Sequence, residues 1–121
     1  MNKEINSGLI HAYHKRTHTP LRKAKEILNG MDMVLFDRVL RAMDEQPDPR
    51  EPFYDPIEDD SETKTIIAQA KDDARSKVRD KHGLGRGSCH LIWREAAEIL
   101  KEKHNITWFS PAKMNPLVSY D

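Results

Sequence analysis

Apolar residues recur every three or four positions in several stretches of the chain, a spacing that places them on one side of an α-helix. The clearest stretch is 89–104, whose apolar positions are Cys89, Ile92, Trp93, Ala96, Ile99 and Leu100. Charged residues fill most of the other positions from 94 onward, so the two faces of this segment differ in polarity. We therefore predict an amphipathic helix from Cys89 to His104, with Trp93 inside the core.

Residues that typically begin or end helices divide the rest of the chain into further segments. Thr19 before Pro20 is typical of a helix start, and Gly30 is typical of a helix end. The predicted segments are a helix from about Ser7, a helix capped by Thr19 that ends at Gly30, a helix capped by Asp32, a helix from Asp59 to Gly83, the helix that ends at Asn105, and one turn after Ser110.

Residues 47–60 interrupt the helical pattern. They contain four prolines, which cannot continue a helix, and six acidic residues against one basic residue. We predict an extended segment here, which we call the acidic strap. Its aromatic residues, Phe53 and Tyr54, are expected either to pack against the rest of the chain or to contact a partner.

The pattern predicts an all-α fold: a small helical bundle of about four helices with an extended proline-rich acidic linker and an irregular C-terminal tail. The chain has 121 residues, the usual length of one domain. Within this single domain, 1–121, we distinguish an N-terminal helical part at 1–46, the acidic strap at 47–60, and a C-terminal helical hairpin and tail at 61–121.

Composition narrows the classes of protein that fit. Charged residues make up 33% of the chain, but 20 basic residues balance 20 acidic ones. This neutrality disfavours a histone-like protein and makes a homo-oligomer plausible, since little net charge keeps copies apart. The single cysteine excludes an intrachain disulfide, and no apolar run has the length of a secretion signal or a membrane span. We expect a cytoplasmic protein without a membrane partner.

Basic residues are concentrated near the N-terminus. The stretch between residues 5 and 25 has no acid, and its cations, which we call the basic arm, are Lys15, Arg16, Arg22, Lys23 and Lys25. Such a cluster binds nucleic-acid phosphates without reading base sequence, and basic residues from Lys77 to Arg86 would add to it. Alternatively, the arm's charge of +5 meets the strap's charge of −5, inside the molecule or across a dimer.

Glycines at 83, 85 and 87 precede the helix at 89–104. The backbone N–H groups of such a loop could hold an anion, with Lys81 and Arg86 nearby. The spacing matches neither the dinucleotide-binding motif nor the P-loop, so a loose helix connection is the alternative.

Histidine and cysteine positions raise the question of a metal- or thiol-dependent enzyme. His11, His14 and His18 would share one face of a continuous helix, although Pro20 disfavours helix through His18. Cys89, at a helix start near Arg86, would favour its thiolate, but no base is placed to serve it. We therefore predict no catalytic residues, no metal site and no cofactor.

The function we expect is that of a non-enzymatic helical binding or regulatory protein that acts through protein–protein contacts, as an accessory or inhibitor-like protein does. The predicted protein-binding residues belong to the acidic strap and are Phe53, Tyr54, Asp55, Glu58 and Asp59. The alternative is a nucleic-acid-binding protein, whose predicted contacts are Lys15, Arg16, Arg22, Lys23, Lys25, Lys81 and Arg86.

Overall fold

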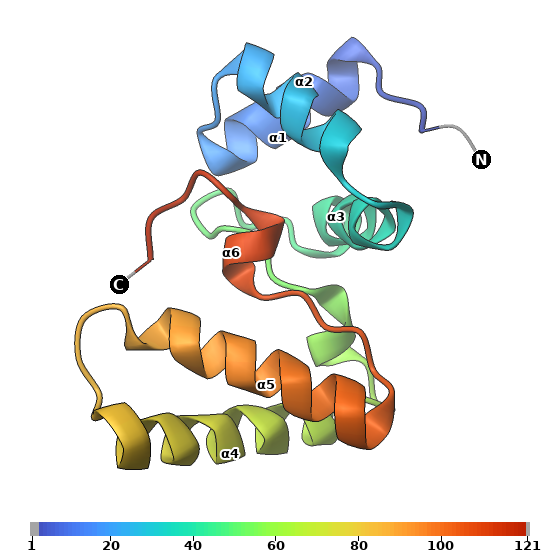
Figure 1. Cartoon of the computed structure of the whole chain (residues 1–121). Coiled ribbons are helices and arrows are strands. Elements are labelled where there is room, and N and C mark those ends of the chain that lie inside the picture. The colour runs from blue at the N-terminus through green and yellow to red at the C-terminus, as the bar shows by residue number, and fades with distance from the viewer. Residues whose placement is uncertain (1–2, 121) are drawn as a thin grey trace.

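The structure, a computed structural model that describes residues 3–120, is built from helices (Figure 1). The elements are α1 Ser7–Thr17, α2 Leu21–Gly30, α3 Met33–Glu45, a 3₁₀ turn at Pro56–Asp59, α4 Lys64–His82, α5 Ser88–His104 and α6 Pro111–Met114. The predicted all-α class is confirmed. None of the helices in this range is both long and apolar enough to cross a bilayer.

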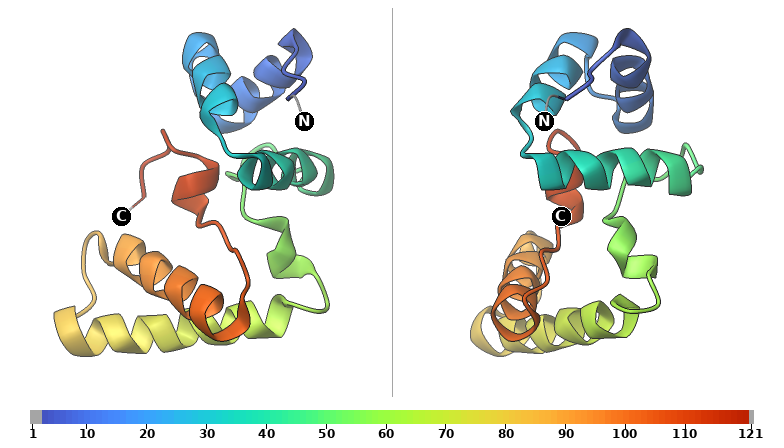
Figure 2. Two further views of the ribbon diagram at one scale, coloured as in Figure 1. Left: turned by 45° about the vertical axis from the view of Figure 1, so that its right-hand side comes forward. Right: turned by 90° about the vertical axis from the view of Figure 1, so that its right-hand side faces the viewer.

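The helices form two groups, α1–α3 and the α4–α5 hairpin, with α6 between them (Figure 2). Each group packs around its own apolar cluster, so the expected bundle of about four helices is not confirmed. The first cluster lies among α1, α2 and α3 and includes Phe53 of the strap and Met114 of α6. The second lies between α4 and α5 and includes Ile57 of the strap and Trp108. The strap and the segment after α5 therefore each contribute to both clusters and join them.

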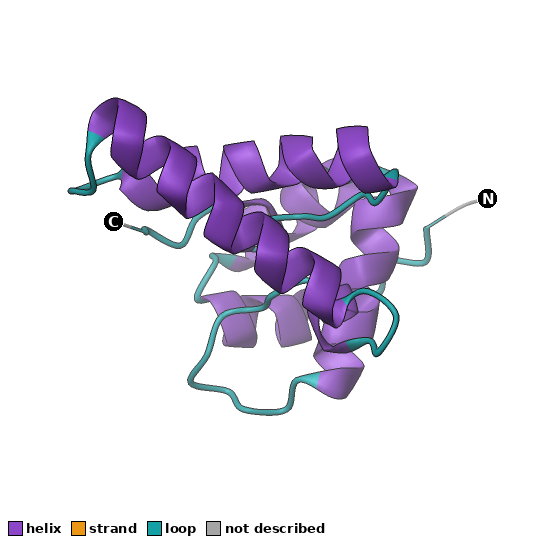
Figure 3. Cartoon of the chain, turned by 90° about the horizontal axis from the view of Figure 1, so that it is seen from below, coloured by secondary structure: helices purple, strands orange, loops and turns teal. Residues whose placement is uncertain are grey.

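Helices α4 and α5 form a hairpin and lie side by side (Figure 1). The colouring by secondary structure shows that helices and loops make up the described part of the chain (Figure 3). Their contact is made of small side chains: Ala70 and Ala74 of α4 and Ala96 of α5 are all buried. Small residues let two helix backbones approach closely. In the connection, Gly83 and Gly87 adopt positive φ angles of 74° and 81°, which glycine tolerates without strain.

The carboxylate of Asp55 joins three segments of the chain. Arg38 of α3 donates from Nη1 to Asp55 Oδ2 at 2.6 Å, and the Phe109 backbone N–H donates to the same oxygen at 2.9 Å. The Ile57 N–H donates to Oδ1 at 3.2 Å. Arg38 also donates to the Thr107 carbonyl oxygen at 2.9 Å. This buried group therefore ties α3, the strap and the C-terminal segment together.

The buried side chain of Asn115 makes a second junction between distant segments. Its Oδ1 accepts from the Phe53 N–H at 3.0 Å, and its Nδ2 donates to the Phe53 carbonyl oxygen at 2.7 Å. One residue earlier, the Met114 carbonyl oxygen accepts from the Tyr13 hydroxyl at 2.9 Å. The end of α6 is thereby joined to the strap and to α1.

Most of the predicted helix ends are where the local signals placed them. The Asp32 side chain accepts from the Leu35 N–H, as a cap does, and Asn105 ends α5 with a left-handed φ of 53°. Two predicted starts were wrong. The Thr19 hydroxyl bonds the Thr17 hydroxyl at 2.7 Å instead of capping α2. Helix α4 begins at Lys64 instead of Asp59, and Pro56–Asp59 form a separate 3₁₀ turn.

Trp93 is only half-buried, which corrects its predicted place inside the core. The face of α5 that contacts α4 is centred on Ala96 and Leu100, both fully buried. Trp93 precedes Ala96 by three positions and so lies about 60° away around the helix. Its indole is consequently at the edge of the core, and it lines a groove next to the face of α5 that contacts α4.

Candidate functional site

The acidic groups of the strap are largely occupied by partners inside the molecule. Asp55 bonds Arg38, and its side chain is fully buried. Burial raises the pKa of the Asp55 carboxyl above its ordinary value, while the N–H of Phe109 and the charge of Arg38 oppose that shift. The Phe53 side chain, 1% exposed, belongs to the first apolar cluster. Neither residue presents the open surface expected of a partner-binding position.

The remaining predicted strap residues also have internal partners. Glu58 forms an ion pair with Lys71 and accepts from Trp108 Nε1 at 2.9 Å. Asp59 accepts from the Tyr54 hydroxyl, and this bond raises the pKa of Tyr54 to about 12. These side chains hold the strap against α4 and the C-terminal segment.

Three of the strap's carboxylates, those of Asp55, Glu58 and Asp60, pair with cations of α3 and α4, and Asp48 pairs with Arg50 of the strap itself. Asp60, for example, is held by Arg41, and this hydrogen bond lowers the pKa of the Asp60 carboxyl. From the arm, Arg16 reaches the strap: its Nε donates to the Glu51 carbonyl oxygen at 2.7 Å. Its guanidinium carbon also lies 4.5 Å from the centre of the Phe53 ring. Arm and strap thus meet through a backbone oxygen and an aromatic ring.

The other cations of the arm point outward. Lys23 pairs with Glu26 of the same helix at 3.4 Å. Lys15, Arg22 and Lys25 are exposed, and no carboxylate within the described range forms an ion pair with any of them. Three positive charges of the arm are therefore available to a ligand.

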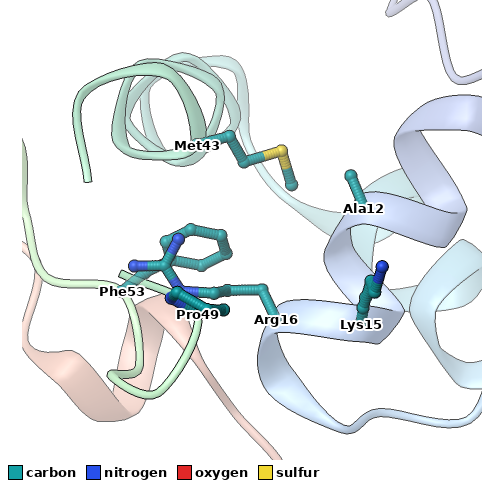
Figure 4. Close-up of a pocket in the computed structure, with 6 residues that line it drawn as sticks. All are labelled: Ala12, Lys15, Arg16, Met43, Pro49 and Phe53. Carbon is teal, nitrogen blue, oxygen red and sulfur yellow. The ribbon is translucent and has the colours of Figure 1, made fainter. Parts of the chain in front are cut away.

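Arm and strap enclose a pocket of about 230 Å³ between α1, α3 and the strap (Figure 4), which we call the arm–strap pocket. Its lining residues are Ala12, Lys15, Arg16, Met43, Pro49 and Phe53. The Arg16 side chain crosses the pocket toward the strap, and Met43 faces it from α3. The pocket combines an apolar interior with two cations, and it brings together residues predicted separately for protein and for anion binding.

A second and larger concavity, about 580 Å³, lies between α5 and the segment 108–113; we call it the α5 groove. Its α5 wall carries His90, Trp93, Arg94, Ala97, Glu98 and Lys101. Its other wall carries Trp108, Ser110, Ala112 and Lys113. We expected no binding role for this face of α5 from the sequence.

The glycine-rich connection between α4 and α5 has its predicted anion-binding residues at the surface. Lys81, in the last turn of α4, and Arg86, in the connection, are both exposed, and Lys77, one helical turn before Lys81, pairs with Glu95 of α5. Gly87 ends the connection and caps α5 without a side-chain hydrogen bond.

The histidines do not gather as a metal site would require. His18 ends α1 in a left-handed conformation, so it leaves the face that His11 and His14 would share. His14 Nδ1 lies 2.6 Å from the Thr19 carbonyl oxygen. Among residues 3–120 no group of three or more potential ligands comes together. Cys89 is a partly buried free thiol.

Comparisons with models of protein families, with curated proteins and with solved structures found no match. The physical features of the two concavities and of the exposed arm are therefore the basis for assigning a function.

Proposed function

We propose that this chain is a non-enzymatic binding protein that acts through protein contacts and uses the arm–strap pocket to hold one side chain of its partner. The observation that supports this proposal is the pocket's composition. Met43 and Pro49 supply accessible apolar surface next to the buried Phe53 ring, while Lys15 and Arg16 supply positive charge. An apolar side chain next to a carboxylate has the complementary chemistry.

The size of the pocket favours an anchor residue over a small molecule. Small-molecule sites usually measure about 300–1,000 Å³, whereas this pocket measures about 230 Å³. In protein interfaces a few side chains inserted into pockets supply most of the binding free energy. A single leucine-like or aromatic side chain of a partner suits such a pocket.

The two cations that line the arm–strap pocket have different roles. Arg16 is committed to the Glu51 carbonyl oxygen and the Phe53 ring, so it holds the wall of the pocket. Lys15 is exposed and has no ion-pair partner in the part of the chain described, so it is the group that meets the partner's carboxylate. The motif we expect is an apolar residue adjacent to Asp or Glu.

A displayed library of random seven-residue peptides, selected on the purified protein, tests this proposal. Enriched peptides should share the expected motif, and a labelled member should bind Ala12→Trp at least about tenfold more weakly, because the indole fills the pocket. The matched control is Ala68→Trp, also at an exposed alanine but on α4, which should bind as the wild type does. Peptides that bind Ala12→Trp undiminished would contradict the proposal.

Nucleic-acid binding by the basic arm is the second candidate, supported by the exposure of Lys15, Arg22 and Lys25. Contacts to phosphates weaken steeply with salt. The anisotropy of a labelled DNA duplex should therefore fall between about 50 and 200 mM salt, and the double variant Arg22→Glu, Lys25→Glu should abolish binding. That variant leaves the pocket lining intact, so peptide binding should persist. No duplex binding at the lower salt concentration would exclude this candidate.

A further inference from the structure

We infer that the α5 groove is a separate binding site for a nucleotide unit, an aromatic base joined to a phosphate. This site does not overlap with the arm–strap pocket: the two have no lining residue in common. Three features of the groove support the assignment: its size and shape, its charge, and its tryptophans.

The groove has the dimensions of a ligand site. Its volume of about 580 Å³ falls within the range of about 300–1,000 Å³ that is usual for small-molecule and cofactor sites. The α5 residues that line it follow helical spacing from His90 to Lys101, eleven positions that span about 16 Å at 1.5 Å per residue. The wall is thus one continuous face of α5, opposite Lys113, Trp108 and the small residues Ser110 and Ala112.

The charge of the groove is complementary to a phosphate. Arg94, Lys101 and Lys113 line it, against one acid, Glu98, so its formal charge is +2 with His90 neutral. None of these three cations forms an ion pair with a carboxylate in residues 3–120; Lys101 is 3.5 Å from the Thr107 hydroxyl. A phosphate monoester carries about −1.5 to −2 charges at neutral pH, which matches this total.

Trp93, which is half-buried, gives the groove fixed aromatic surface, and Trp108, 4% exposed, lines the groove from within the core. The Trp93 ring is held by edge-to-face contacts with His90, 5.6 Å between centroids, and with Tyr120, 5.2 Å. The Trp108 ring is fixed by the hydrogen bond from its Nε1 to Glu58. Aromatic side chains beside positive charge are the means by which proteins hold single nucleotide units, because every base has an aromatic face. An acidic peptide without an aromatic ring would use only the charge.

The chain's two tryptophans both line the groove, so they report on it directly. In a ¹H–¹⁵N NMR titration with AMP, at least one indole N–H signal should shift and saturate. Adenosine alone and inorganic phosphate alone should each bind at least about tenfold more weakly, because each lacks half of the recognised chemistry. A short oligo(dA) separates the two sources of the unit: it should bind more tightly than AMP if the natural ligand is a nucleic-acid strand, and no more tightly if it is a free nucleotide.

Matched charge variants localise the binding. Arg94→Ala should weaken AMP binding about tenfold, the change expected when one charge-assisted hydrogen bond is lost. Lys103→Ala, an exposed cation of α5 outside the groove, should leave it unchanged. The inference is overturned if neither AMP nor the oligonucleotide shifts an indole signal, if phosphate alone binds as well as AMP, or if Arg94→Ala binds as the wild type does.

Discussion

Replacement of Asp55 by alanine should both destabilise the protein and uncouple its two apolar clusters. The carboxylate accepts hydrogen bonds from Arg38, Phe109 and Ile57, three residues that come from α3, the C-terminal segment and the strap. Without it, the Arg38 side chain, which is 19% exposed, keeps the Thr107 carbonyl oxygen as its hydrogen-bond partner. The Phe109 N–H loses its acceptor as well.

The expected loss follows from the burial of this pair. Removal of one partner of a fully buried ion pair usually costs about 3–5 kcal/mol, and we expect the lower end of that range because Arg38 is 19% exposed and keeps the Thr107 carbonyl oxygen. The free energy of unfolding of a domain is about 5–15 kcal/mol in total, so Asp55→Ala should remove a large share of it. The double variant Arg38→Met, Asp55→Ala should recover about 1–3 kcal/mol relative to the sum of the single effects.

Urea unfolding followed by two probes measures both effects. Circular dichroism reports all helices, whereas tryptophan fluorescence reports the second cluster, where Trp93 and Trp108 lie. The two transitions should coincide in the wild type and separate in Asp55→Ala. The control, Asp37→Ala, changes an exposed acid of α3 and should stay within about 0.5 kcal/mol of the wild type. A cost below about 1 kcal/mol for Asp55→Ala, with coincident transitions, would refute the reasoning.

Two further changes test other contacts of the strap. Asn115→Ala should cost about 2–4 kcal/mol in urea unfolding, since the buried N–H and carbonyl of Phe53 both lose their partner; a cost under about 1 kcal/mol would contradict that contact. Tyr54→Phe should remove a tyrosinate absorbance transition near pH 12. The Tyr54 pKa is raised from 10.0 to about 12, so the stability from this bond is present below pH 10 and is lost as the pH rises through about 12. Persistence of that transition in the variant would show that another tyrosine produces it.

The helices could be predicted because their signals are local. An aspartate at 32, a glycine at 83, an asparagine at 105 and a serine before Pro111 each bond backbone groups within a few residues, and each ends or begins a helix in the structure. The prediction that Thr19 caps α2 was wrong because another local contact uses the same group: the Thr19 hydroxyl bonds the Thr17 hydroxyl.

The candidate sites depend on contacts between distant segments, which periodicity does not specify. The sequence shows a basic segment and an acidic segment, but it does not specify which cation pairs with which carboxylate. In the structure Asp55 pairs with Arg38, and Asp60 pairs with Arg41. No pattern in the sequence predicted that Met43 and Pro49 line a pocket together with residues of the basic arm. The α5 groove had a detectable signal: the face next to Trp93 carries Ala97, and then Lys101, at helical spacing.

The acidic strap acts as a built-in connector, since its carboxylates at Asp55, Glu58, Asp59 and Asp60 all have partners within the chain. Amide hydrogen exchange tests this arrangement most directly, because N–H groups of the strap donate to specific acceptors. Those of Phe53, Tyr54, Ile57 and Glu58 donate to Asn115 Oδ1, Gln46 Oε1, Asp55 Oδ1 and the Asp55 carbonyl oxygen. We expect these amides to exchange slowly, with protection comparable to that of the α4 interior. Exchange at the rate of an unstructured peptide, while α4 stays protected, would contradict the account.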